Sequence, residues 1–420
     1  MRDLSGVAEP AEGSARAVVP LLEPSGGVPA PITGTAELEQ ALDRLAAGTG
    51  PVAVDAERAS GYRYSQRAYL VQLRRAGAGT MLIDPTGLAD LSVLNAVIGD
   101  AEWVLHAASQ DLPCLAELGL RPSHLFDTEL AGRLLGHPRV GLGAMVEQVL
   151  GLRLEKGHSA ADWSTRPLPM PWLVYAALDV EVLLELKASL EAELAAAGKL
   201  AWAHQEFAAI AATTMPAPRT DPWRRTSGMH KIRSRRQLAV VRALWESRDE
   251  LAQRRDLAPG RVLPDSAIVA AALADPKSPA ELQALPVFGG RHHRRLAPRW
   301  YAAMQAALRL PESALPPHTV PSDGPPPANR WAERDPIAAG RLAAARAHLG
   351  SLAEQLCLPV ENLVTPDLVR RLAWAPPADS SPEGVAERLR RHGARPWQVK
   401  LVATPLSEAF ATGPAAGPAR

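Results

Sequence analysis

The sequence predicts an α/β domain, with a mixed sheet flanked by helices, followed by two small all-α helical bundles. Short strand-like and helix-like segments alternate up to about residue 125, which is typical of a sheet covered by helices. Only helical patterns follow, and two proline-containing segments divide them. The 420 residues suffice for this arrangement, because one domain takes about 150 residues.

The first domain opens with an amphipathic helix at residues 35–45, for which Thr35 is a suitable N-cap. Apolar and β-branched runs predict strands at 52–56, 69–73, 80–84 and 102–106. Helices are expected at 88–98 and 109–118, and Pro113 falls in the first turn of the second, where no N–H is needed. From Phe126 onward the pattern is helical and ends in a long helix at about 171–197.

The remaining segments set the expected domain boundaries. Helices are predicted at 234–254, 265–273, 279–284 and 290–309, and again at 336–356, 365–373, 381–391 and 396–411. The similar length and order of the two sets predict a divergent repeat. The expected division is a flexible tail at 1–32, the α/β domain at 33–213, a linker at 214–228, a first bundle at 229–310, a proline-rich linker at 311–330, a second bundle at 331–412 and a tail at 413–420.

The net charge of +1 hides an uneven distribution. Residues 1–220 carry 17 Lys and Arg against 26 Asp and Glu, whereas residues 221–310 carry 17 against 8. An acidic module joined to a basic one indicates a catalytic part and a part that holds a polyanion, although solvated charged helix faces explain the charge alone equally well.

Targeting and redox features are sparse. Cys114 and Cys357 have no metal-type spacing and cannot form a disulfide framework, so both are expected to be reduced and buried. The first residues lack the apolar core of a signal peptide, and no apolar run approaches the roughly 18 residues of a membrane span. The chain is expected to be cytoplasmic, monomeric and without membrane contact.

Acidic residues supply the candidate site. Asp55 and Glu57 end a predicted strand two residues apart, so their side chains share one face. Two adjacent carboxylates repel each other unless a cation lies between them, and hard divalent cations take oxygen ligands. Asp111 lies in the first turn of the helix after strand 102–106, where the helix dipole alone could explain it. Tyr175 and Asp179 are four residues apart on one face of the long helix, in an apolar run where an unpaired carboxylate is costly to bury.

The order D-x-E, then H-A-x-x-x-D, then Y-x-x-x-D resembles the DEDD exonucleases of the tyrosine-containing branch. The stretch from Lys156 to Leu168, K-G-H-S-A-A-D-W-S-T-R-P-L, running on to Y-A-A-L-D, resembles the ribonuclease D family in particular. Residues 228–310 resemble an HRDC domain, the helical bundle that follows the nuclease domain in that family. The resemblance covers residues 35–310 well, and 331–412 only as a second bundle of the same general type. It implies a ribonuclease H-like exonuclease domain.

The resemblance also implies a mechanism, the hydrolysis of the terminal phosphodiester at an RNA 3′ end with two divalent cations, Mg²⁺ or Mn²⁺. Asp55 would bridge both cations, Glu57 and Asp179 would complete one, and Asp111 would act through water. Tyr175 would orient the attacking water rather than act as a free base, because a tyrosine pKa near 10 is too high. His106 is interpreted as structural.

Basic side chains outside this cluster are expected to bind RNA phosphates without reading sequence. Lys156 and Arg166 lie close in sequence to the catalytic helix, and pairing with Asp162 is the alternative for them. The remaining candidates lie in the basic bundle: Arg224, Arg225, Lys231, Arg233, Arg235, Arg236, Arg291, Arg294 and Arg295.

The expected function is that of a 3′–5′ exoribonuclease acting on structured RNA, such as the 3′ ends of tRNA precursors. Two alternatives stay open. A DNA exonuclease of the proofreading or repair type would use the same cation site, and the contacts to the 2′-hydroxyl that separate RNA from DNA are not visible in a sequence. A non-catalytic RNA-binding protein is the other, although all four carboxylates and the tyrosine are present.

Overall fold

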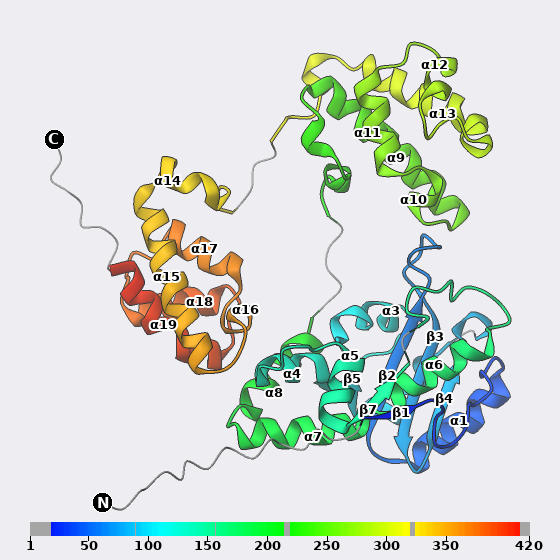
Figure 1. Cartoon of the computed structure of the whole chain (residues 1–420), viewed down its shortest axis with the longest axis vertical. Coiled ribbons are helices and arrows are strands. Elements are labelled where there is room, and N and C mark those ends of the chain that lie inside the picture. The colour runs from blue at the N-terminus through cyan, green and yellow to red at the C-terminus, as the bar shows by residue number, and fades with distance from the viewer. Residues whose placement is uncertain (1–17, 89, 156, 214–218, 320–323, 412–420) are drawn as a thin grey trace, which may run out of the picture.

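The protein is represented by a computed structural model that describes residues 18–88, 90–155, 157–213, 219–319 and 324–411. It consists of an α/β part and two helical bundles, as Figure 1 shows. The middle bundle lies above the α/β part in this view, and the C-terminal bundle lies to its left. The predicted fold class is confirmed. None of the helices in the described ranges combines the length and apolar composition that a membrane span requires.

The α/β part is built on a five-stranded mixed sheet. Its order is β4-β3-β2-β5-β6, from β2 Thr49–Arg58, β3 Ala68–Ala76, β4 Gly79–Ile83, β5 Glu102–Leu105 and β6 His124–Asp127. Strand β2 pairs antiparallel with β3 and parallel with β5, so it occupies the centre. This position brings the end of β2 next to the segment that follows β5. A separate parallel pair joins β1 Val19–Leu21 to β7 Leu152–Leu154.

Helices cover the sheet. They are α1 Thr35–Ala47, α2 Asn95–Ile98, α3 Leu112–Glu117, α4 Thr128–Leu135, α5 Leu142–Met145, α6 Met170–Glu181, α7 Leu183–Ala196 and α8 Leu200–Ala211. Helix α6 packs on β2, β3 and β4, while α7 contacts β2 and β5. Asp127 starts α4 by accepting hydrogen bonds from the backbone N–H groups of Glu129 and Leu130, and Gly136 ends it in the left-handed conformation. Because α6 packs on β2, its side chains lie over the central strand of the sheet.

Several predicted elements are wrong in extent. The helix expected at 88–98 is reduced to a 3₁₀ turn at Ser92–Leu94 and the four residues of α2. Phe126 lies in strand β6 rather than in a helix. The long helix at 171–197 is two helices, because Val182 separates α6 from α7. Cys357 is exposed, not buried, and both cysteines are free.

The middle bundle has its own apolar core. It comprises α9 Arg235–Arg255, α10 Pro259–Val262, α11 Asp265–Ala274, α12 Pro279–Ala284 and α13 Arg291–Leu308. Ser234 caps α9 by accepting from the backbone N–H of Gln237, whose side chain accepts from the N–H of Ser234 in return. The core centres on Trp223, Phe288 and Trp300.

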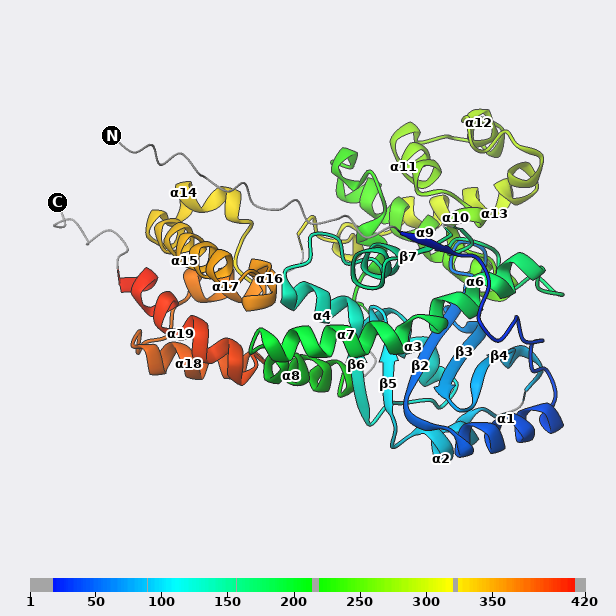
Figure 2. The same cartoon turned by 60° about the horizontal axis from the view of Figure 1, so that its bottom comes forward.

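The C-terminal bundle shares one continuous core with the α/β part. It comprises α14 Trp331–Arg334, α15 Pro336–Gln355, α16 Val360–Leu363, α17 Pro366–Trp374, α18 Pro382–Arg391 and α19 Pro396–Ala411. Figure 2 shows this bundle beside α7 and α8. Trp202 of α8 stacks on Trp397 of α19 with ring centroids 4.9 Å apart, and the Trp397 indole N–H donates to Glu206 at 2.9 Å. The two parts are therefore packed together rather than linked only by the chain.

The middle bundle meets the α/β part at the β2–β3 loop. Asp256, the residue after α9, accepts hydrogen bonds from the backbone N–H groups of Tyr64 and Ser65 at 3.2 and 3.1 Å. The backbone N–H of Ala258 donates to the carbonyl of Tyr62 at 2.9 Å. Figure 1 shows the end of α10 next to this loop.

Candidate active site

Three carboxylates from two elements meet at the C-terminal end of β2. Asp55 and Glu57 project from one face of the strand because side chains alternate along it. Asp179 comes from α6, which packs on the same strand. One oxygen of each carboxylate lies within 4.8 Å of the others. The cluster opens into a cavity of about 830 Å³ that Asp111 and Tyr175 also line.

Burial makes these carboxylates weak acids in the protein alone. The pKa of Asp55 is raised by burial to about 6. Burial raises the pKa of Glu57 and of Asp179 well above the ordinary range, and the neighbouring Asp55 charge raises each further. Ionising Glu57 and Asp179 at neutral pH therefore requires compensating positive charge. An all-oxygen donor set of this kind suits hard divalent cations, so the cluster is consistent with divalent metal binding.

Asp111 lies beside this cluster and not within it. It ends the 3₁₀ turn Ala108–Gln110, starts α3, and is 7% exposed. Burial and the charge of Asp55 raise its pKa to about 8. Its Oδ1 lies 3.6 Å from Nη2 of Arg58, a charged neighbour that sequence reasoning missed although it directly follows Glu57.

Tyr175 lies one helical turn before Asp179, and its phenol interacts with that carboxylate. Burial, followed by the charge of Asp179, raises the pKa of the phenol above its ordinary value of 10. The ring packs edge-on against His158 at 5.9 Å and lies 6.4 Å from Trp163. The hydroxyl therefore stays protonated at neutral pH and points to the cluster as a hydrogen-bond donor.

His106 has a structural environment. Its Nδ1 lies 2.9 Å from the hydroxyl of Thr128, and burial lowers its pKa to about 4. It is a neutral side chain of the cavity wall at physiological pH.

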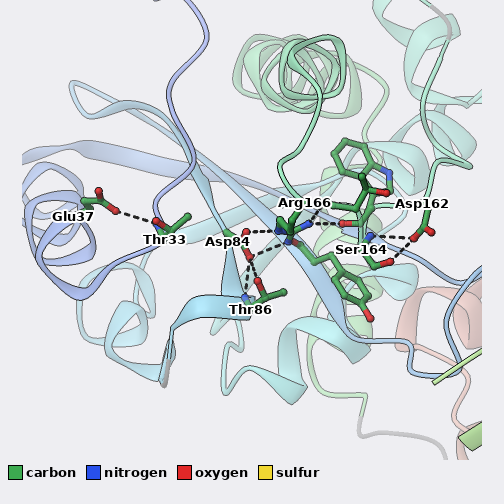
Figure 3. A network of polar contacts seen from close by, with 10 residues as sticks. Thr33, Glu37, Asp84, Thr86, Asp162, Ser164 and Arg166 are labelled. Carbon is green, nitrogen blue, oxygen red and sulfur yellow. Dashed lines mark hydrogen bonds and ion pairs between the residues drawn. The ribbon is translucent and has the colours of Figure 1, made fainter. Parts of the chain in front are cut away.

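Arg166 holds two loops together, as Figure 3 shows. Its Nε and Nη2 donate to the two carboxylate oxygens of Asp84 at 2.6 and 2.9 Å. The other donors reach the carbonyls of Trp163, Thr165 and Tyr69, each at 2.7 Å. All five N–H groups of the guanidinium are thus engaged. This geometry argues against the expected phosphate contact and gives Arg166 the role of fixing the segment before α6 to the sheet.

Three arginines of the basic bundle hold the segment at 308–317 instead of facing solvent freely. Arg235 donates to the carbonyls of Glu312, Leu315 and Pro316, and Arg236 to those of Leu308 and Leu310. Arg224 donates to the carbonyl of Pro317 and to Asp221. The remaining candidates of this bundle are exposed: Arg225, Lys231, Arg233, Arg291, Arg294 and Arg295. Lys156 lies outside the described residues.

Family models match three stretches of the chain. Residues 29–195 match a 3′-5′ exonuclease model, residues 237–304 an HRDC domain, and residues 324–410 a 3′ to 5′ exonuclease C-terminal domain. The chain is 34% identical over 273 residues to the ribonuclease D of Escherichia coli (strain K12), covering 63% of this chain and 71% of that protein. The chain belongs to the ribonuclease D family. A second family member, from Acidiphilium cryptum, is 33% identical over 70% of this chain and 80% of its own.

Solved structures agree over nearly the whole length. A protein from Bifidobacterium adolescentis is 40% identical, with a TM-score of 0.85 over 94% of this chain and all of that one. The E. coli ribonuclease D structure, described as an exoribonuclease involved in structured RNA processing, is 27% identical with a TM-score of 0.66 over 92% and 99% of the two chains. The ribonuclease D resemblance inferred from the motifs is thereby confirmed.

Proposed function

We propose that this chain removes nucleotides from the 3′ ends of structured RNA, including tRNA precursors, with Asp55, Glu57 and Asp179 as ligands of two divalent cations, Mg²⁺ or Mn²⁺. Membership of the ribonuclease D family makes the chain a 3′–5′ exoribonuclease. The observation that supports the site is the convergence within 4.8 Å of three carboxylates, of which Glu57 and Asp179 are buried and Asp55 is half-buried. The description of the E. coli structure supports structured RNA as the substrate.

The carboxylates fit the cations that the family implies. Burial raises the pKa of all three carboxyl groups, so the binding of cations at this cluster is coupled to the release of protons. Asp111, outside the cluster, would contact a cation through water. When bound, the cations supply the positive charge that in-line attack of water on a phosphodiester requires.

Tyr175 positions the attacking water. Its phenol stays protonated because its pKa lies above 10, so it serves as a hydrogen-bond donor and not as a base. The interaction with Asp179 and the packing against His158 orient the phenol before substrate arrives. Orientation of this kind lowers the barrier without a proton transfer to the tyrosine.

The middle bundle holds the body of the RNA through phosphate contacts. Its exposed cations lie in two groups, around Lys231 and around Arg294. Contacts with phosphates alone carry no sequence information, and their affinity falls steeply with salt.

The test is hydrolysis of a 5′-labelled hairpin RNA with a single-stranded 3′ extension, next to a DNA of the same sequence, in Mg²⁺, Mn²⁺ or EDTA. We expect stepwise shortening of the RNA from its 3′ end that requires cation. Asp179→Asn should slow it by about 100-fold or more, while the same change at exposed Asp100 leaves it unchanged. Tyr175→Phe should lower kcat by about 10²-fold at an unchanged KM.

An RNA left intact with either cation would contradict the proposal. Faster degradation of the DNA would reassign the chain to DNA repair or proofreading chemistry. Normal trimming by Asp179→Asn would remove the carboxylate cluster from the mechanism.

A further inference from the structure

Arg58 occupies an unusual position beside the carboxylates. It is the last residue of β2, and the pairing of β2 with β3 shifts register between Glu57 and Arg58. Its guanidinium faces Asp111 at 3.6 Å, which is too long for a hydrogen bond, and its side chain remains 28% exposed. Within the described part of the chain the structure shows no hydrogen bond from this guanidinium. Its donors are therefore available to a ligand.

The other two basic side chains of the cavity wall, Arg133 and His106, are paired or neutral. Arg133 donates twice to Glu129, at 2.9 and 2.5 Å, so its charge is neutralised. His106 is neutral because burial lowers its pKa to about 4. Among the described residues that line the 830 Å³ cavity, Arg58 is thus the one guanidinium that makes no hydrogen bond.

A second cavity of about 270 Å³ adjoins the first along the β2–β3 loop. Ser60, Gly61 and residues 159–161 line it, and Glu57, Arg58 and Ser159 line both cavities. A polymer that has its scissile phosphate at the carboxylates and enters the second cavity must therefore pass Arg58.

The loop that walls the second cavity is held from the middle bundle. Arg261 donates to the carbonyl of Gly61 at 2.8 Å and lies over the Tyr62 ring at 4.1 Å. On the other side, Arg63 donates to the hydroxyl of Ser164 at 2.8 Å. The wall is thereby fixed before any ligand arrives, which lowers the cost of ordering on binding.

We propose that Arg58 binds a non-bridging oxygen of the backbone phosphate immediately 5′ of the scissile one, and so sets the register of the RNA 3′ end at the carboxylates. This inference rests on the proposed function. A guanidinium suits the task because its planar donors match phosphate oxygens and its charge persists at every working pH. It also offsets the repulsion that the acidic cluster exerts on a polyanion.

The test is a thermodynamic cycle that combines substitution of Arg58 in the protein with neutralisation of one phosphate at a time in the substrate. A methylphosphonate, which lacks the phosphate charge, replaces one linkage at a time in the last four nucleotides of a short RNA, leaving the scissile linkage intact. The nucleotide on the 5′ side carries a 2′-O-methyl group for chemical stability, and a 2′-O-methyl phosphodiester serves as the matched control. Removal of the terminal nucleotide is measured in single turnovers with wild type, Arg58→Gln and Arg58→Lys.

In the wild type, neutralising the linkage 5′ of the scissile one should slow cleavage by about 10- to 100-fold. Arg58→Gln should be slow on the normal RNA by a similar factor and insensitive to that methylphosphonate, while other linkages behave as in the wild type. Arg58→Lys should keep part of the sensitivity.

Additive effects of Arg58→Gln and the methylphosphonate at every linkage would overturn the proposal and make Arg58 only a counter-charge for Asp111. The same cycle is measured as RNA affinity in the Asp179→Asn background, with Ca²⁺. This second readout decides the role of Arg58 even for a chain that hydrolyses no RNA, so failure of the proposed function is seen separately.

Discussion

Lys199 fastens the C-terminal bundle to the catalytic domain, and its removal should loosen that bundle selectively. Only 8% of the residue is exposed, between α7 and α8. Its ammonium donates to the carbonyl of Leu134, the penultimate residue of α4, at 2.7 Å and to that of Leu356, just after α15, at 2.6 Å. A third contact reaches the carbonyl of Cys357 at 3.4 Å. Carbonyls at helix ends lack intrahelical partners, so one lysine satisfies both helices.

Lys199→Met keeps much of the side-chain volume and removes the charge and the donors. Each short hydrogen bond from a charged group contributes about 1.5–3 kcal/mol. Part of this is offset because the buried ammonium is itself desolvated, which also lowers its pKa. We therefore expect a net loss of about 2–4 kcal/mol in the free energy of opening this interface.

Hydrogen–deuterium exchange resolves the effect by region, which matters because a chain of several domains does not unfold in two states. Exchange should rise in α15 and α19 and stay unchanged in the middle bundle, whose core is separate. Lys231→Met, the same substitution at an exposed site, is the control and should leave hydrogen–deuterium exchange in α15 and α19 unchanged. Unchanged exchange in α15 and α19 after Lys199→Met would refute the reasoning, as would an equal rise in the middle bundle.

Two further predictions concern the cavity and its wall. Without divalent cations, the free energy of unfolding should fall as the pH rises from 6 to 8. Asp111, with a pKa of about 8, binds more protons in the folded than in the unfolded protein over this range, and Asp55, with a pKa of about 6, does so at its lower end. Mg²⁺ should restore more stability at pH 8 than at pH 6, measured as the thermal shift against EDTA; a larger shift at pH 6 would show that the carboxylates are not the ligands. Asp256→Ala removes the acceptor for the N–H groups of Tyr64 and Ser65, so exchange in residues 59–67 should rise and RNA hydrolysis should slow, with α11 and α13 unaffected. Unchanged hydrolysis with a freed loop would mean that this clamp does not serve the active site.

Local sequence patterns were sufficient to predict that Asp55 and Glu57 share one face of a strand, and that Tyr175 and Asp179 share one face of a helix. Element boundaries were less visible. Strand β6 is four residues long, too short for a period-of-two pattern to stand out from the helical one that follows it. No glycine or proline lies at Val182, where α6 ends and α7 begins, so the local sequence does not predict this break.

The basic residues show where sequence reasoning stops. Arg166, Arg235 and Arg236 read as a polyanion-binding surface, yet their guanidinium groups hold loop carbonyls and an acidic partner of the protein itself. Arg58 attracted no attention in the sequence, and the structure leaves its donors free. Which arginine is engaged depends on carbonyls brought close by other segments, and this information is not local.

By itself, the sequence determined the fold class, the family and the chemical kind of the site, because residue spacing along a strand or helix fixes which side chains share a face. Only the tertiary structure showed that Asp179 lies next to Asp55 and Glu57, and that Asp111 lies outside this cluster and faces Arg58. It also showed that the C-terminal bundle shares one apolar core with the catalytic domain. These depend on β2 lying centrally between β3 and β5 with α6 packed across it. Contacts between segments more than a hundred residues apart arise from packing, and no local pattern encodes them.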